Sequence, residues 1–232
     1  MSTPPAPPAL QVPQVPPLTP PPEKSGMGLL LGVIGGLVVV FVAGTVGLGV
    51  LWRDAEKQLP EARTRLTLPH ALDDGTYVLA QDLSAVDGEK IKAAANNTWS
   101  TEVTEGVVGR YSLRGDRTKG ALVLAGMYGR FVNPGAIRDG ALRGDGEARG
   151  TTTVVGPRDV TPAGSPVRIS CEVLRRDGAL VSITYPVCAW ADANTSAVMA
   201  EMTFGSANAD LDLKAAARTA LRIRSETVRP IH

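Results

Sequence analysis

The sequence predicts an α+β protein: an antiparallel sheet of about six to seven strands with a C-terminal helix packed on it, preceded by one transmembrane helix and a disordered proline-rich tail. Three observations predict it. Residues 1–25 carry 10 of the 18 prolines, residues 26–52 carry no charge, and residues 68–232 hold short apolar runs separated by Asp-Gly turns. We therefore expect a tail at 1–25, a transmembrane helix at 26–52, a stalk at 53–67 and a folded domain at 68–232.

The proline-rich tail is too poor in large apolar side chains to build a core. Its only charges are Glu23 and Lys24, and its P-x-x-P spacings favour extended polyproline II. Such a segment could dock into an aromatic groove of a cytoplasmic partner, or it could be a solvated spacer, the commoner use of this composition.

The stretch from Met27 to Leu51 contains no ionisable residue, and a helix of this length, at about 1.5 Å per residue, crosses a hydrocarbon core about 30 Å thick. Trp52 and Arg53 follow it, as expected at a membrane–water boundary. A cleaved signal peptide is the competing interpretation. Its apolar region would be shorter, its start basic and its end an A-x-A-like site, so the sequence favours an uncleaved anchor.

Glycines recur every fourth residue in this segment, at Gly28, Gly32 and Gly36. They would line one helix face on which a second helix could approach closely, which predicts self-association through the span. The alternative is that glycine is simply frequent in membrane helices.

The flanking charges and the cysteines disagree about orientation. Lys24 precedes the span, whereas Arg53, Lys57, Arg63 and Arg65 follow it, which by the positive-inside rule places the domain in the cytoplasm. Long domains, however, translocate largely regardless of charge, and the pair of cysteines described below favours an oxidising compartment. We expect a single-pass protein of the cell membrane with its N-terminus cytoplasmic and its C-terminal domain outside.

Within the domain, seven runs rich in Val, Ile, Thr and Tyr predict strands, and they lie too close together for helical crossovers. They are Tyr77–Ala80, Val107–Leu113, Ala121–Val132, Thr151–Val160, Val167–Leu174, Ala179–Ala189 and Ser196–Phe204. The pattern predicts helices only at 88–96 and 210–225. The turn signals between runs include Asn133-Pro134-Gly135, Asp139-Gly140 and Asp145-Gly146.

The helix at 210–225 is amphipathic, and we expect its apolar face, Leu213, Ala217, Ala220 and Leu221, to lie across the sheet. Its opposite face carries Lys214, Arg218 and Arg222 at steps of four. This basic stripe is a candidate contact for anionic lipid or cell-wall polymer; the alternative is an ordinary solvated helix face.

Cys171 and Cys188 are the only cysteines. A disulfide between them would stabilise the domain by about 3 kcal/mol in the chain-entropy model, and two free thiols outside the cell would be unusual. A two-residue hairpin at Asp177-Gly178 would leave Cys188 about 13 Å from the position opposite Cys171. We therefore expect the disulfide together with either a longer loop around 176–180 or a bulge near Pro186.

The segment Cys171–Met199 reads CEVLRRDGALVSITYPVCAWADANTSAVM and precedes the terminal helix. With the proline-rich start and glycine-rich span, it resembles actinobacterial single-pass membrane proteins that have an extracytoplasmic two-cysteine α+β domain and a VCAWAD-N-type strand end. The resemblance implies this layout and fold, and it implies no activity or binding site.

The sequence offers no catalytic, cofactor or metal site. The only histidines are His70 and His232, and no nucleophile elbow, Walker loop or zinc-ligand spacing is present. Asp73, Asp74, Asp192 and Asn194 could hold calcium, although turn formation also explains them. The net charge of +1 argues against nucleic acid as a partner.

These observations predict a membrane-anchored extracytoplasmic module that binds or senses something at the cell envelope. Two alternatives stay open. One is an envelope hydrolase that uses two carboxylates and no histidine. The other is a scaffold that recruits a cytoplasmic partner through the proline-rich tail.

Overall fold

The computed structural model of the chain describes residues 59–96, 100–147, 150–178, 182–204 and 211–231. The predicted tail, the transmembrane helix with Gly28, Gly32 and Gly36, and the first part of the stalk lie outside these residues. Within the described ranges, every helix is too short or too polar to cross a bilayer.

The domain is built on an eight-stranded antiparallel sheet in the order β2-β3-β4-β5-β9-β8-β7-β6. Its strands are β2 (Ala71–Leu72), β3 (Tyr77–Asp82), β4 (Thr101–Leu113), β5 (Asp116–Phe131), β6 (Thr151–Asp159), β7 (Ile169–Asp177), β8 (Ser182–Ala191) and β9 (Thr195–Thr203). A separate ribbon pairs β1 (Thr64–Leu66) with β10 (Val228–Pro230). The helices are α2 (Glu89–Ala95), which follows a helical turn at Ser84–Gly88, α3 (Pro134–Glu147) and α4 (Leu213–Thr227).

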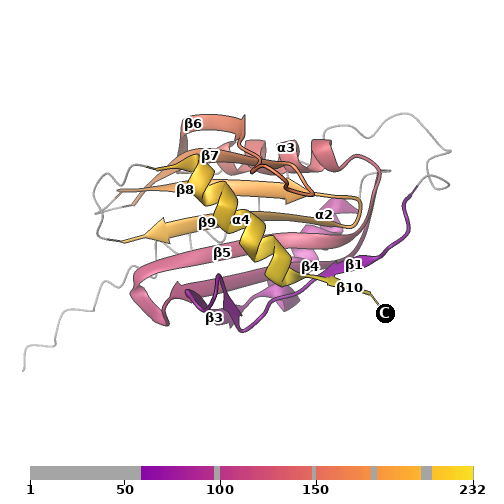
Figure 1. Cartoon of the computed structure of the whole chain (residues 1–232), viewed down its shortest axis with the longest axis horizontal. Coiled ribbons are helices and arrows are strands. Elements are labelled where there is room, and N and C mark those ends of the chain that lie inside the picture. The colour runs from indigo at the N-terminus through magenta and orange to yellow at the C-terminus, as the bar shows by residue number, and fades with distance from the viewer. Residues whose placement is uncertain (1–58, 97–99, 148–149, 179–181, 205–210, 232) are drawn as a thin grey trace, which may run out of the picture.

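The helices cover both faces of the sheet, so the domain has three layers (Figure 1). α4 lies diagonally across one face, and α2 and α3 lie on the other. The central strand β5 shows why: Leu122 and Leu124 pack toward α4, whereas Val123 and Ala125 pack toward α2 and α3. A strand buried on both faces reads as a continuous apolar run instead of an alternating one.

The predicted C-terminal helix on the sheet is confirmed. The carboxylate of Asp212 accepts a hydrogen bond from the backbone N–H of Lys214 at 2.8 Å and so caps the N-terminus of α4. The residues that face the sheet are mostly small, which lets the helix backbone lie close to the strands; the buried positions are Ala216, Ala217, Ala220, Ile223 and Thr227.

The predicted disulfide is also confirmed, and the register explains how it forms. Cys171 and Cys188 are direct cross-strand partners in β7 and β8, with a Cα–Cα distance of 4.1 Å. Asp177 pairs with Ser182, so residues 178–181 form the connection. Of the two alternatives that the sequence left open, a longer loop or a bulge near Pro186, the structure has the longer loop. Pro186 causes no bulge in this register. The pairing of β8 with β9 begins at the next residue, because proline has no N–H to donate.

Helix α3 is the main element that the sequence did not predict. Pro134, Asp139-Gly140 and Asp145-Gly146 were expected in turns, but they lie in one helix. The side chain of Asn133 accepts a hydrogen bond from the N–H of Ala136 at 3.1 Å, which caps the helix start. Ile137, Ala141 and Leu142 are buried against the sheet, and this packing outweighs the cost of glycine in a helix.

The folded chain also begins earlier than residue 68. Thr64–Leu66, which the sequence assigns to the stalk, forms β1, and the side chain of Leu66 is only 2% exposed in the core under α4. The ribbon β1–β10 therefore belongs to the domain and not to a separate stalk.

Candidate functional site at the entry of the chain

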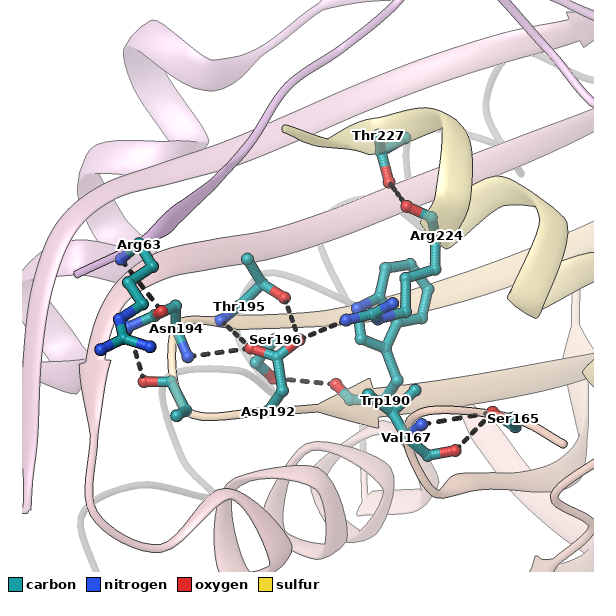
Figure 2. A network of polar contacts seen from close by, with 11 residues as sticks. Arg63, Ser165, Val167, Trp190, Asp192, Asn194, Thr195, Ser196, Arg224 and Thr227 are labelled. Atoms are coloured by element: carbon teal, nitrogen blue, oxygen red, sulfur yellow. Dashed lines mark hydrogen bonds and ion pairs between the residues drawn. The ribbon is translucent and has the colours of Figure 1, made fainter. Parts of the chain in front are cut away.

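A polar network that joins distant segments lies at the turn between β8 and β9 (Figure 2). Asp192 organises this turn. Its Oδ1 accepts hydrogen bonds from the backbone N–H groups of Asn194 at 2.8 Å and Thr195 at 2.7 Å. Its Oδ2 accepts a third from the hydroxyl of Thr195 at 2.8 Å. Asp192 and Asn194 therefore form a turn, which was the alternative to calcium binding for these residues.

Asp192 also binds helix α4. A guanidinium N–H of Arg224 donates to Oδ2 at 2.6 Å, and the two side chains are only 17% and 23% exposed. Burial by itself would raise the pKa of Asp192, but the hydrogen bonds from Arg224, Asn194 and Thr195 outweigh it and hold this pKa below its ordinary value. The carboxylate thus stays charged and joins the last turns of α4 to the end of β8.

Asn194 attaches the segment through which the chain enters the domain to the same turn. Its Oδ1 accepts a hydrogen bond from the backbone N–H of Arg63 at 3.1 Å. Its Nδ2 donates to the carbonyls of Glu61 at 2.8 Å and Gly129 at 3.0 Å. The Asn194 side chain is buried, so these bonds form away from bulk water, where leaving them unmade would be costly.

A second set of bonds continues this attachment. The Nε of Arg130 donates to the carbonyl of Pro60 at 3.0 Å, and the backbone N–H of Thr67 donates to the carbonyl of Thr227 at 2.9 Å. Between these points β1 pairs with β10. The first and last described parts of the domain are therefore joined, and Figure 1 shows them side by side at one end of the sheet. We call residues 59–67 with β10 the entry junction.

The VCAWAD-N segment that the sequence singled out binds the entry junction through Asn194 and supplies part of the core beside it. Cys188 forms the disulfide, and Trp190 is the largest fully buried side chain in the part of the chain that the structure describes. The hydroxyl of Ser196 donates to the carbonyl of Trp190 at 3.2 Å and closes the turn. This segment thus links β8 to β7 through the disulfide and to the entering chain through Asn194. Long-range partners such as Arg63 and Arg224 could not be inferred from the segment itself.

The basic stripe on α4 is largely neutralised. Arg222 pairs with Asp73 at 2.6 Å, and Arg218 lies 3.8 Å from Asp212. Lys214 is exposed. The backbone N–H of Asp73 also donates a hydrogen bond to the carboxylate of Glu226 in α4 at 2.7 Å. These contacts attach the β2–β3 turn to α4, so the stripe is part of a network of opposite charges.

One buried carboxyl was missed by sequence reasoning. Glu172 in β7 is 1% exposed, and its Oε1 has no hydrogen-bond partner in the described structure. Burial raises the pKa of Glu172 to about 7. The side chain points to the face of the sheet that α3 covers, together with Leu174 two residues on. The signal was present, since Glu172 is a single acid in the apolar run ISCEVL.

A further carboxylate contact joins β3 to β9. The hydroxyl of Tyr77 donates to Oε1 of Glu201 at 2.5 Å. Burial and the neighbouring Glu201 both raise the pKa of Tyr77, so the phenol keeps its proton and is not activated as a nucleophile. In the described ranges, no three His, Cys, Asp or Glu side chains gather as a metal site would require.

Comparisons with protein-family models, with curated proteins and with solved structures found no match to this chain.

Proposed function

We propose that this chain is a membrane-anchored binding or sensing module of the cell envelope, with one span, a cytoplasmic N-terminus and a rigid extracytoplasmic domain. The entry junction is the observation that carries the proposal. The chain that leaves the uncharged segment 26–52 is bonded into the domain by Asn194 and by β10 at Glu61, Arg63 and 64–66, about a dozen residues further on. This attachment fixes the edge of the domain at which the chain enters, and that edge is therefore the part of the domain nearest to the proposed anchor along the chain.

The disulfide supports the outward orientation. Cys171 and Cys188 are fully buried and bonded in the core beneath α4, and bonds of this kind persist in oxidising compartments. The resemblance of Cys171–Met199 to extracytoplasmic domains of actinobacterial membrane proteins agrees with this orientation.

The positive charges after the span weigh less against this orientation than they did in the sequence. Arg63 and Arg65 lie in the entry junction, and Arg65 is part of strand β1. Charges in short loops set orientation, whereas folded domains translocate largely regardless of charge. Only Arg53 and Lys57 then remain as loop charges after the span.

The chemistry of the site favours binding over hydrolysis. The two carboxylates described above already have partners: Asp192 pairs with Arg224, and Glu201 accepts a hydrogen bond from the hydroxyl of Tyr77. A hydrolase that uses two carboxyls needs one that gives up a proton beside one that stays charged across the same cleft. Glu172, the one carboxyl with a raised pKa among the described residues, lies buried in the sheet under α3.

The test is a topology measurement on intact cells that express the full chain. We expect it to remain in the membrane pellet after alkaline carbonate extraction. External protease should remove the domain, and alkylation under denaturing conditions should label Cys171 and Cys188 only after reduction. A cytoplasmic marker protein that stays intact controls for lysis. A domain that survives external protease, or cysteines that are labelled without reduction, would refute the proposed orientation.

A further inference from the structure

We propose that the outer face of the β1–β10 ribbon docks onto anionic phospholipid headgroups of the membrane that anchors the chain. This inference rests on the proposed function, because it requires that residues 26–52 span a bilayer. It identifies the surface that the domain presents to that bilayer.

The register of the ribbon brings two arginines together. Arg65 of β1 and Arg229 of β10 are direct cross-strand partners, so their side chains project from the same face of the ribbon. Both are exposed, whereas Leu66 and Val228 on the other face pack into the core under α4. Like charges directly opposite each other destabilise a strand pair unless an anion compensates them.

In the described part of the domain, neither arginine forms a salt bridge. Neither Arg65 nor Arg229 has a carboxylate within 4.0 Å there, although Arg229 donates to the backbone carbonyl of Ser225 at 3.0 Å. Arg63 adds a third positive charge, and its partner Glu61 is itself 73% exposed. An exposed ion pair of this kind is weak and can exchange for another anion.

The length of the chain before the ribbon limits its distance from the bilayer. Seven residue steps separate Trp52, at the predicted boundary of the span, from Leu59, the first described residue, and seven extended residues reach at most about 25 Å. The ribbon is the first element after this tether. Its arginines are thus within reach of the bilayer surface, and each would contribute roughly a fivefold gain in binding on contact with anionic lipid.

An apolar residue continues the same strand. Ile231 is 43% exposed, and its backbone N–H donates to the carbonyl of Arg63 at 2.9 Å, which holds it beside the basic face. An apolar side chain among arginines suits the boundary between headgroups and acyl chains. The basic stripe on α4 fits such a surface less well, because Arg218 and Arg222 already have acidic partners.

The experiment uses the full chain in nanodiscs of phosphatidylcholine, with or without about a third phosphatidylglycerol, a content that gives a clear negative surface. Hydrogen exchange is followed by mass spectrometry in peptides that cover 59–70 and 225–231. We expect several-fold slower exchange of both peptides on the anionic discs, and loss of this protection in high salt.

The variant Arg65→Gln/Arg229→Gln should lose the protection, and the matched control Lys214→Gln/Arg218→Gln should keep it. Unchanged exchange in β5 shows that each variant is folded. Equal exchange on both kinds of disc, protection that survives Arg65→Gln/Arg229→Gln, or the same protection from free glycerol phosphate on neutral discs would each overturn the inference. A chain that fails to enter nanodiscs at all would instead refute the proposed function, and the inference with it.

Discussion

Gly88 and Gly106 lie back to back where the helical turn before α2 crosses β4. A Cβ at Gly88 would stand 2.1 Å from the carbonyl oxygen of Gly106, and the reverse distance is also 2.1 Å. Neither backbone can shift easily, since Gly106 lies in a sheet strand and Gly88 opens α2. The close approach sets α2 against the sheet and helps to bury Ile91.

We predict that Gly106→Ala lowers the free energy of unfolding by about 2–3 kcal/mol, because an added methyl forces the two backbones apart. Urea unfolding of the full chain in detergent, followed by circular dichroism, measures it. Gly156→Ala is the matched control: it lies in edge strand β6, and a Cβ there meets nothing within 4 Å. Equal stabilities of the two variants would show that the close approach is not a constraint.

Removing the disulfide should destabilise the domain without changing its fold. The bond closes a loop with a sequence separation of 17, so the variant Cys171→Ala/Cys188→Ala should lose about 3 kcal/mol of unfolding free energy. Reduction of the natural chain should reproduce most of this loss, whereas reductant should not change the stability of the double variant. If reduction leaves the natural chain unaffected, the bond contributes no stability.

The ion pair between Asp192 and Arg224 should couple the β8–β9 turn to α4. Asp192→Ala removes the carboxylate that accepts hydrogen bonds from Asn194, Thr195 and Arg224. We expect the free energy of unfolding to fall by about 2–4 kcal/mol. Arg224→Met should cost less, because the carboxylate of Asp192 keeps its hydrogen bonds from Asn194 and Thr195. A double-mutant cycle of these two changes measures the coupling; a coupling energy near zero would mean that each side chain acts alone.

The lowered pKa of Asp192 also predicts that the domain loses stability in acid. Because the pKa of Asp192 is lowered in the folded state, its contribution is complete above its unfolded value of about 3.9 and is lost as the pH falls through the folded pKa. The stability of the Asp192→Ala variant should therefore fall less steeply below this pH than that of the natural chain.

Glu172 should give the opposite dependence at higher pH. Its folded pKa of about 7 lies above the ordinary 4.5, so between these values the folded state holds a proton that the unfolded state has lost. Stability should fall as the pH rises through this window, by on the order of 3 kcal/mol in total, and then level off. Glu172→Gln should remove this slope and be more stable than the natural chain at pH 8.

Unfolding free energies between pH 4.5 and pH 8 test this. Glu89→Gln, which removes an exposed carboxyl from α2, is the control and should leave the slope unchanged. A pH dependence that persists in Glu172→Gln would assign it to another group.

The local pattern of the sequence determined most of the sheet. All seven predicted runs became strands in one antiparallel sheet, because β-branched and aromatic runs between Asp-Gly turns have few other ways to bury their side chains. The helix before β4 and the terminal helix α4 were equally visible. The disulfide followed from two cysteines in neighbouring runs.

Tertiary structure alone decided the rest. Helix α3 forms on glycine-rich residues because Ile137 and Leu142 find an apolar sheet face beneath them, and that face is assembled from strands far away in the sequence. The entry junction likewise joins Arg63 to Asn194, 131 positions apart. Short-range patterns record propensity and periodicity, whereas a buried hydrogen bond between distant segments depends on a register that exists only once the whole sheet has formed.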